Sequence, residues 1–315
     1  MKISIIIISY NTRDLLRACL QSVYRQTPEV DFEIIIVDNA STDGSREMLQ
    51  QEFPQAKKIF NTTNKGFAAA NNQALAQATG EYLLLLNSDT EVLPGAITQS
   101  LEFMEQHPEA GIVGCKLLNP DFTLQPSCES FPNFWDVVFE SFFLDRLFPN
   151  NKLFGRFHLR FFRYDRIAKV DSVMGAFLLI RRATVEAIGM LDEGFFFYSE
   201  ETDWCYRAKR KGWEVYFFPG AQAIHHCSQS ADPVASKMFV QLHASRYRFY
   251  KKYHSTASSL AVRLVFALGA FLRIPLWTGM TFYRLLFEPG KAATGWKKVR
   301  AQCAALAWYL GLVKI

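Results

Sequence analysis

The sequence predicts an α/β protein built on a doubly wound, mostly parallel sheet, with a helical appendage at its C-terminal end. Short apolar runs alternate with segments of helical periodicity, which is the pattern of parallel strands joined by crossover helices. Several of these runs end in polar residues, as strands do at the ligand-binding edge of an open α/β sheet. The chain has 315 residues, half of them hydrophobic, which allows one large domain with an appendage and a full core.

The elements can be placed in order along the chain. We expect strands at residues 3–8, 33–37, 59–60, 82–86, 112–115, 176–180 and 215–218, and helices at 13–25, from 41–43 to 53, and at 65–78. The first run is continuous and β-branched, as in a strand buried on both faces. Asn11 and Thr12 can cap the first helix, and Ser41, Thr42 and Asp43 are expected to start the second.

Polar residues follow each of the first strands. These polar ends are Ser9-Tyr10-Asn11, Asp38-Asn39, residues 61–64, and Asn87-Ser88-Asp89. A single such end is an ordinary turn, because Asn and Asp are common turn formers, but four in succession favour a binding site at one edge of the sheet. Asp89 emerges from an apolar run, and an oxygen-rich turn there suits a hard divalent cation that holds a diphosphate.

Read in order, these and further segments resemble a family 2 glycosyltransferase of the GT-A fold, in the branch that includes rhamnosyltransferases. The resemblance covers roughly residues 1–250, and it rests on the ordered combination of motifs that are each only moderately specific. The matching segments are Ser9-Tyr10-Asn11, residues 37–45 and 64–71, Leu86-Asn87-Ser88-Asp89, residues 175–182, Asp192-Glu193 with residues 195–198, Glu200-Glu201-Thr202-Asp203, and His225.

The resemblance implies a site for a nucleotide-sugar. Asp38 would accept hydrogen bonds from a uracil or thymine edge or from ribose, and Asn64-Lys65-Gly66 would offer amides and a cation to phosphate or ribose. The other nucleotide-sugar contacts that it implies are Ser9, Tyr10, Asn11, Asn71, Asn87 and Ser88. Structural alternatives stay open, since Asp38 can cap the next helix and Asn64-Lys65-Gly66 can be a plain turn.

The resemblance also implies Mn²⁺ or Mg²⁺ on the diphosphate, held by Asp89. Asn87 stands where the family often has Asp, and its amide oxygen is a weaker ligand. His225 corresponds to a histidine that contacts metal or phosphate, and its spacing to Ser230 supports that match, whereas an isolated histidine can equally be structural. Ser228 replaces a glycine of the family pattern.

Glu200-Glu201-Thr202-Asp203 is the expected catalytic segment. With Asp192 and Glu193 it crowds carboxylates into twelve residues, and crowded carboxylates raise one another's pKa toward neutrality, as a general base requires. By resemblance the second acid of the pair, Glu201, is the base, with Glu where the family has Asp, and Glu200 precedes it. Asp203 is the alternative base, although it can also simply cap a helix.

The predicted catalytic domain is residues 1–235. Two regions differ from its α/β pattern, one within the domain and one after it. Residues 119–170 contain many Phe and several Pro and Arg, and we expect an insertion on the acceptor side of the site, or else a plain covering. Residues 236–315 carry 13 Lys and Arg against one acid, whereas residues 1–235 carry 22 against 29 acids. This basic, aromatic region favours an anionic membrane surface, and no nucleic-acid motif accompanies its charge.

The helices of this basic region are expected to lie in the membrane interface. Residues 236–252 read as an amphipathic helix, and the longest uncharged stretches beyond it, 274–283 and 301–313, have ten and thirteen residues. A membrane-spanning helix needs about 20. A soluble helical subdomain or an oligomer interface is the alternative.

The arginines beyond residue 255 are regularly spaced. At about 100° per residue, Arg263, Arg273 and Arg284 fall within about 80° of one another and would form one stripe. Pro275 is expected to break the helix that carries them.

The sequence therefore predicts an inverting, metal-dependent glycosyltransferase. It would move one sugar from a nucleotide-sugar to a hydroxyl of a lipid-linked saccharide in cell-surface polysaccharide assembly. The resemblance favours dTDP-rhamnose, with UDP-sugars second. Processive synthases of the family usually carry several spanning helices and a Gln-x-x-Arg-Trp motif, and the sequence contains neither.

We expect peripheral attachment to the cytoplasmic face of the plasma membrane. The N-terminus enters a strand without a cleavage site, and six scattered cysteines suggest reduced thiols. A sugar-nucleotide pyrophosphorylase is one rival, but Ser9-Tyr10-Asn11 is not the Gly-rich phosphate loop that it needs. An inactive binding or scaffold protein is the other, and the presence of Asp89 and the acidic segment argues against it.

Overall fold

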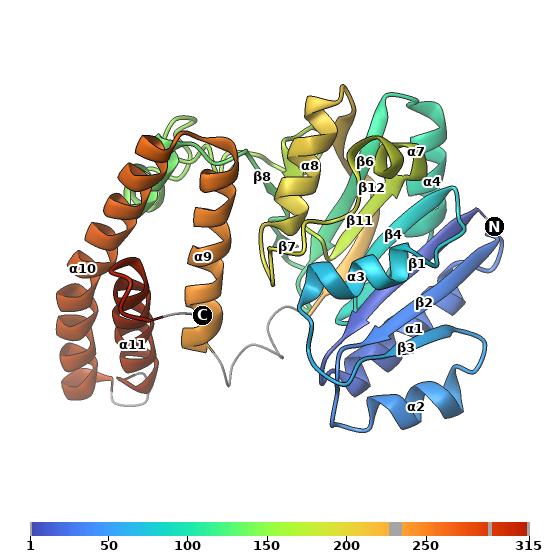
Figure 1. The fold of residues 1–315 in the computed structure, drawn as a ribbon, viewed down its shortest axis with the longest axis horizontal. Helices are drawn as coiled ribbons and strands as arrows, with labels where there is room; N and C mark the ends of the chain where they lie inside the picture. The colour runs from blue at the N-terminus through green and yellow to red at the C-terminus, as the bar shows by residue number, and fades with distance from the viewer. Residues whose placement is uncertain (1, 227–234, 289–291, 314–315) are drawn as a thin grey trace. The chain divides into compact units, whose positions relative to one another are not determined.

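The computed structural model describes residues 2–226, 235–288 and 292–313 (Figure 1). The chain divides into two compact units. The sheet unit comprises Met1–Phe131, Phe162–Phe196 and Glu200–Ser230, and the helical unit comprises Pro132–Phe161, Phe197–Ser199 and Ala231–Ile315. Residues 119–170 are therefore shared between the two units.

The sheet unit is built on a mixed, mostly parallel sheet, as predicted. Its strands are β1 Ile3–Ser9, β2 Phe32–Asp38, β3 Lys57–Phe60, β4 Tyr82–Asn87, β5 Thr90–Val92, β6 Ala110–Leu118, β7 Leu124–Gln125, β9 Ala168–Lys169, β11 Phe177–Arg181 and β12 Glu214–His225. Their order is β3-β2-β1-β4-β11-β6-β12-β5, with β7 beside β6 and β9 beside β12. A separate antiparallel ladder joins β8 Cys128–Glu129 to β10 Ser172–Val173.

The first four strands end together at one edge of this sheet. They are parallel, and their register sets Ser9 opposite Asp38, Ile8 opposite Asn87, and Asp38 opposite Phe60. This confirms that the polar strand ends predicted from the sequence line up. The runs form central strands because their apolar side chains are buried on both faces.

β11 enters the sheet in the opposite direction. It pairs antiparallel with β4, with Phe177 opposite Leu86, and antiparallel with β6 on its other side. The beginning of β11 therefore lies at the edge where β4 ends, and there the Asn87 N–H donates to the Ala176 carbonyl at 3.1 Å.

β12 brings a distant segment to the same edge. It runs parallel to β6, so it ends at the edge of the sheet where β4 ends. Its last residues pair antiparallel with β5, with His225 opposite Thr90. β5 begins directly after Asp89. A short strand that the sequence pattern did not indicate thus places Asp89 and His225 together.

Helices cover both faces of the sheet. They are α1 Arg13–Gln26, α2 Ser45–Glu52, α3 Phe67–Leu75, α4 Ala96–Gln106, α7 Arg182–Ile188 and α8 Glu200–Arg210. The apolar sides of α1, α2 and α4 share one core with every second residue of the strands, including Ile5 and Ile34. α3 crosses the opposite face (Figure 1).

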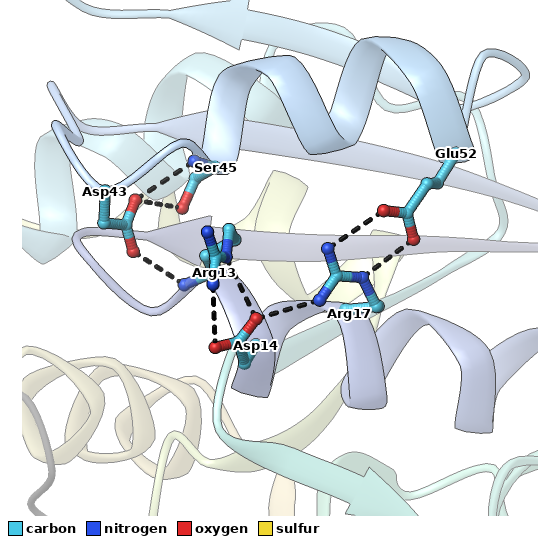
Figure 2. Close-up of polar contacts among 6 residues, drawn as sticks. All are labelled: Arg13, Asp14, Arg17, Asp43, Ser45 and Glu52. Carbon is cyan, nitrogen blue, oxygen red and sulfur yellow. Dashed lines mark hydrogen bonds and ion pairs between the residues drawn. The ribbon is translucent and has the colours of Figure 1, made fainter.

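α1 is capped by a residue of another loop, which corrects the prediction that Asn11 and Thr12 cap it. The described side chain of Thr12 makes no cap bond. Instead the Arg13 N–H donates to Asp43 Oδ2 at 2.8 Å, and Asp43 Oδ1 accepts from the Ser45 N–H at 3.1 Å (Figure 2). One carboxylate therefore serves the starts of two helices, and α2 begins at Ser45 rather than at residues 41–43.

Figure 2 also shows a second link between these helices. Arg17 donates through Nε and Nη2 to both carboxylate oxygens of Glu52, at 2.8 and 2.9 Å, and through Nη1 to Asp14 at 2.8 Å. The paired geometry is the strongest that arginine makes with a carboxylate, but exposure to water weakens such a bridge.

The helical unit has its own small core. Its helices are α5 Phe134–Ser141, α6 Leu144–Leu147, α9 Ala235–Tyr253, α10 Thr256–Phe287 and α11 Ala292–Tyr309. The buried side chains at its centre are Val137, Tyr250, Val262, Phe266, Ala305 and Tyr309. The Tyr309 ring, at the end of α11, stacks on the Phe266 ring near the start of α10, with 5.6 Å between centroids.

α10 continues through Pro275, so the prediction that this proline breaks the helix is wrong. α11 packs along α10 on both sides of the proline. Lys298 Nζ lies 4.1 Å from the Trp277 ring centroid, and Arg263 Nε donates to the Tyr309 carbonyl at 2.7 Å. Tertiary packing therefore outweighs the local cost of the missing N–H.

By length and composition α10 is apolar enough to cross a membrane, and no other helix of the described residues meets that test. The expectation that charges keep every stretch too short for this does not hold for the helix as a whole. Core helices of soluble proteins pass the same test.

Glu33 links three segments at the opposite end of the sheet. It is 8% exposed, and it accepts hydrogen bonds from the Ser4 hydroxyl at 2.7 Å and from the Thr79 N–H at 2.7 Å. Lys57 lies 2.6 Å from its other oxygen. Burial favours the neutral carboxyl, but the bonds from Lys57, Thr79 and Ser4 outweigh it and lower the pKa of Glu33 to about 2.

We expect Glu33→Ala to lower the free energy of unfolding by about 2 kcal/mol, because the buried Ser4 hydroxyl and the partly buried Thr79 N–H lose their acceptor. The exposed Glu29→Ala is the matched control and should change it by less than about 0.5 kcal/mol. Because the pKa of Glu33 is depressed, its contribution is complete above the ordinary carboxyl range and is lost as pH falls toward 2. Urea denaturation at neutral and acidic pH measures both effects, and equal stability of the two variants would contradict them.

Candidate functional site

Hydroxyl groups join the polar ends of β1 and β4. Thr12 Oγ1 donates to Ser88 Oγ at 2.9 Å and lies 3.0 Å from Ser9 Oγ. Ser9 and Ser88 are both buried, so these two predicted contacts hold the strand ends together. Tyr10 is 45% exposed, which leaves its ring open to a ligand at this edge.

Asn11 ties the loop after β1 to the loop after β2. Its Oδ1 accepts from the Thr42 N–H at 2.8 Å, and its own N–H donates to Ser41 Oγ at 2.9 Å. Its φ of 54° is left-handed, a conformation that asparagine tolerates better than most residues. Asn11 therefore braces the edge on which the other residues stand.

Asp38 is fully buried at the end of β2. Its Oδ2 accepts from Arg46 Nε at 2.7 Å and from the Ser41 N–H at 3.2 Å. The Arg46 guanidinium also donates to the Asn61 carbonyl. Arg46, which the sequence did not single out, therefore fixes one oxygen of Asp38 and leaves Oδ1 for another partner.

The Asn64-Lys65-Gly66 turn is fastened to the end of β2. The Lys65 N–H donates to Asn39 Oδ1 at 3.0 Å, and the Gly66 N–H donates to Asn64 Oδ1 at 2.9 Å. At Gly66, with φ 83°, an added Cβ would lie 2.5 Å from the Phe196 carbonyl oxygen, so only glycine fits. The protein itself uses these amides, and the turn offers a ligand the exposed Lys65 side chain instead.

Several buried oxygens in the predicted site segments have no hydrogen-bond partner among the described residues. They are Asp38 Oδ1, Asn71 Oδ1, Glu200 Oε2 and Glu201 Oε2. A buried unpaired polar atom costs about 1–3 kcal/mol. Such atoms therefore mark places where a ligand or a proton would complete the structure.

Asp89 and His225 meet where β5 pairs with the end of β12. His225 Nε2 lies 3.3 Å from Asp89 Oδ1 and 3.4 Å from Asn87 Nδ2. The Asp89 side chain is 13% exposed and that of His225 is 6% exposed. The structure thus brings these three predicted residues together, from segments more than a hundred residues apart in sequence.

Gln125 fixes the orientation of the His225 ring. Its Nε2 donates to the His225 carbonyl at 3.1 Å and to Asn119 Oδ1 at 2.9 Å, which settles which amide atom is the oxygen. That oxygen lies 2.7 Å from His225 Nδ1, so Nδ1 carries the proton and Nε2 of the neutral ring keeps its lone pair. No sequence pattern pointed to Gln125, which lies in the weakly patterned region 119–170.

These atoms suit a divalent metal. A carboxylate oxygen of Asp89 and the Nε2 lone pair of His225 meet at one point, and the hydrogen-bonded Gln125 amide holds the imidazole from behind, as in known metal sites. No third Asp, Glu, Cys or His joins them among the described residues. A metal bound here would therefore depend on ligand oxygens or water for its remaining coordination.

Glu200 and Glu201 open α8 and lie at the same sheet edge. An added Cβ at Gly175 would lie 3.9 Å from Glu201 Cβ, and the next residue, Ala176, accepts from the Asn87 N–H. Just before α8, Tyr198 and Ser199 both have positive φ, at 70° and 65°. Strained backbone of this kind persists where the surrounding structure imposes it, often at active sites.

Both glutamates hold their protons unusually well. Burial is the main cause, followed for Glu201 by the negative charge of Glu129, and together they raise the pKa of Glu201 to about 7. Burial, and after it the charge of the neighbouring Glu201, raise the pKa of Glu200 well above its ordinary value. Glu129, on β8, is a carboxylate that the sequence reading missed, and it takes the crowding role expected of Asp192 and Glu193.

The other acids of the segment have structural partners. Asp203 is fully buried, and its Oδ2 accepts from Arg207 Nε at 2.8 Å, one turn along α8. Glu193 accepts from Asn72 Nδ2 at 2.9 Å, and Asp192 accepts from the Gly194 N–H. Ser230, whose spacing supported the choice of His225, and Ser228, which replaces a glycine of the family pattern, both lie outside the described residues.

The chain has relatives among known proteins. The family model described as Glycosyl transferase family 2 matches residues 4–170. An N-acetylglucosaminyl-diphospho-decaprenol L-rhamnosyltransferase of Mycobacterium tuberculosis is 25% identical over 266 residues, or 80% of this chain and 84% of that protein. The low-salt glycan biosynthesis hexosyltransferase Agl10 of Haloferax volcanii is 26% identical over 293 residues, or 91% and 85%.

Two solved structures resemble the fold. The mannosyltransferase PcManGT from Pyrobaculum calidifontis, in complex with GDP-Man and Mn²⁺, has a TM-score of 0.57 at 17% identity, covering 99% of this chain and 88% of that one. S. aureus TarS 1–349 has a TM-score of 0.52 at 14% identity, covering 99% and 92%. At such identities the likeness shows the fold alone, and it confirms the predicted GT-A fold.

The family model spans more than half of the chain, and full-length relatives are named glycosyltransferases. The chain therefore belongs to glycosyl transferase family 2.

Proposed function

We propose that this glycosyltransferase is inverting and metal-dependent, and that it moves one sugar from a nucleotide-sugar to a hydroxyl of a lipid-linked saccharide. The observation that carries the proposal is the composition of one sheet edge. There the Asp89–His225 pair and the proton-holding Glu201 are joined through the segment Gly175-Ala176. A metal-binding pair beside a base with a pKa near neutrality is what direct displacement of a diphosphate requires.

Asp38 and Tyr10 are the proposed contacts for the base of the nucleotide. Asp38 Oδ1 is buried and lacks a partner among the described residues, so it can accept the N3–H of thymine or uracil. Tyr10 offers an exposed ring beside it, and Lys65 an exposed cation. dTDP-rhamnose is the favoured sugar donor, because a relative that spans most of the chain is named a rhamnosyltransferase; UDP-sugars come second.

In the proposed reaction, ionised Glu201 removes the proton from an acceptor hydroxyl. The hydroxyl oxygen then forms a bond to the anomeric carbon from the side opposite the diphosphate, the bond from that carbon to the diphosphate oxygen breaks, and the configuration inverts. Asp89 and His225, with Asn87 beside them, would hold Mn²⁺ or Mg²⁺, which offsets the charge on the departing diphosphate. Asp203 is not the proposed base, because Arg207 already engages it.

The acceptor is proposed to be a lipid-linked saccharide of cell-surface polysaccharide assembly. The relative from Mycobacterium tuberculosis is named for such a lipid-diphosphate acceptor. The basic region 236–315 would hold the enzyme peripherally on the cytoplasmic face of the membrane, where that acceptor lies. Nucleotide release measured across a panel of nucleotide-sugars tests the proposal as a whole, since an inactive binding protein would release nucleotide from none of them.

The raised pKa of Glu201 can be tested directly. We expect its carboxyl carbon to titrate near pH 7 in ¹³C-glutamate NMR, with Glu201→Gln identifying the signal. Glu129→Gln should lower that pKa, because it removes a neighbouring negative charge. Glu47→Gln, on the exposed side of α2, should leave it unchanged. Titration of Glu201 in the ordinary carboxyl range would contradict the burial argument.

The proposed base can be tested by Glu201→Gln, which keeps the shape of the side chain but cannot accept the proton. We expect turnover to fall by about 10²–10⁴ while affinity for the nucleotide-sugar is kept. Glu193→Gln, on an exposed acid bound to Asn72, should retain normal turnover. Near-normal turnover in Glu201→Gln would remove the assignment.

The proposed metal site can be tested by Mn²⁺ titration followed by EPR in the presence of nucleoside diphosphate. We expect Asp89→Ala to abolish binding and Gln125→Leu to weaken it about 10–100-fold, because His225 loses its support. Gln99→Leu, an exposed glutamine of α4, is the matched control. Unchanged Mn²⁺ binding in Asp89→Ala, or full activity in excess EDTA, would show that the metal is held elsewhere or not needed.

A further inference from the structure

The exposed side of α10 is apolar, which is the opposite of what is expected for a helix in water. Its exposed apolar side chains include Leu276, Met280, Tyr283 and Phe287, which widen the apolar surface beyond Pro275. Six others lie along one side of the helix: Leu260, Leu264, Leu268, Phe271, Phe282 and Leu286. At about 100° per residue these positions fall within about 80° of one another, so they form one continuous outer face. Leu264 is 71% exposed and Leu286 78% exposed.

The charged residues of α10 point the other way. Arg263, Arg273 and Arg284 lie on the side of the helix opposite the outer face, the side that also carries the buried Val262 and Phe266. Every exposed position from residue 260 to 287, all of them described, holds an uncharged side chain. A helix at the surface of a soluble protein shows the reverse pattern, with its polar side toward water.

Two of these arginines donate hydrogen bonds to backbone carbonyls of the protein. Arg263 Nε donates to the Tyr309 carbonyl at 2.7 Å, and Arg273 donates to the Glu140 carbonyl. The Arg273 guanidinium also lies 4.7 Å from the centroid of the Phe143 ring. Arg263 and Arg273 are therefore engaged within the helical unit, and the outer face of α10 carries no charge.

The positive charge of the helical region indicates which kind of partner covers the outer face of α10. Residues 236–315 carry 13 Lys and Arg against one acid, and Lys251, Lys252, Lys297, Lys298 and Arg300 are exposed on the neighbouring α9 and α11. A second copy of this chain would bring two strongly basic regions together, whereas an anionic bilayer neutralises them. We propose that the outer face of α10 is buried in the apolar surface layer of an anionic lipid bilayer, with α10 lying in the plane of the membrane.

The position of Arg273 favours this orientation over a spanning one. A helix of 32 residues is about 48 Å long, whereas the hydrocarbon core is about 30 Å thick. Arg273 lies near the middle of α10, so a spanning helix would carry it to the bilayer centre, where a charge is most costly. With α10 in the plane, α11 packs along its inner side and the arginines stay within the protein.

The inference names the part of region 236–315 that meets the proposed membrane partner, and it rests on that part of the proposed function. It can be tested with the full chain and two kinds of vesicle, pure phosphatidylcholine and phosphatidylcholine mixed with phosphatidylglycerol. We expect co-sedimentation with the mixed vesicles, and at least about tenfold weaker binding for the double variant Leu264→Glu, Leu268→Glu. Met190→Glu, on an exposed apolar residue of the sheet unit, is the matched control and should bind as the wild type does.

Several outcomes would overturn the inference. Equal vesicle binding by the double variant would show that another surface is responsible. Resistance of the bound protein to alkaline carbonate would indicate a spanning helix. A dimer in light scattering that the same two substitutions dissociate, without vesicle binding, would assign the face to a second copy.

A thermal-shift titration with nucleotide-sugars on the same proteins separates this inference from the proposed function. Vesicle binding without a thermal shift by any nucleotide-sugar would contradict the proposed reaction and support the membrane contact of α10. A thermal shift without vesicle binding would support nucleotide-sugar binding and contradict the membrane contact. The double variant should show a normal shift, because both substituted residues lie in the helical unit.

Discussion

The site depends on one constraint, the antiparallel entry of β11 between β4 and β6. Because β11 runs backwards, its first residue pairs with Leu86 and its approach passes the end of β4. The hydrogen bond from Asn87 to Ala176 fixes that approach, and Gly175 then lies against Glu201. Had β11 been parallel, the segment before it would start at the opposite edge, and the acids of α8 would lose this link to Asp89.

The same constraint orients β12. Since β6 is antiparallel to β11 and β12 is parallel to β6, β12 ends at the edge where β4 ends. Its last residue, His225, can then pair across from Thr90, one residue after Asp89. Asp89, His225 and Glu201 thus reach one edge from three distant parts of the chain because of the directions in which these strands run.

Several buried carboxyl groups at this edge lower the stability of the folded protein. The first turn of a helix favours negative charge, and α8 begins with Glu200 and Glu201. Burial and the nearby Glu129 oppose ionisation, and the result is a Glu201 pKa of about 7. Asp38 likewise keeps one buried oxygen unpaired among the described residues while Arg46 holds the other. These are the costs expected where a protein is shaped for a ligand rather than for its own folding.

The sequence predicted what depends on local pattern. The buried runs placed β1, β2 and β4, and the polar residues after them marked the site edge, because strand burial and turn chemistry are written in neighbouring residues. The roles of Gln125 and Glu129 were not predicted, because both lie on two-residue strands that show no periodicity. Gln125 also contacts His225, which is 100 positions away in the sequence. The cap of α1 was wrong for the same reason, since it comes from Asp43, 30 residues from its partner. The prediction that Pro275 breaks its helix was wrong because packing against α11 outweighs the local helix-breaking preference of proline.

The central claim is that Asp89, His225 and Glu201 serve one reaction at this sheet edge. An anomalous-diffraction map from crystals grown with Mn²⁺ and thymidine diphosphate tests it most directly. We expect a manganese peak bound by Asp89 and His225 Nε2, with the thymine against Asp38 and with Glu201 facing the space beyond the outer phosphate. A metal that sits away from Asp89 while the nucleotide is bound, or a Glu201 carboxylate turned from the diphosphate, would contradict it.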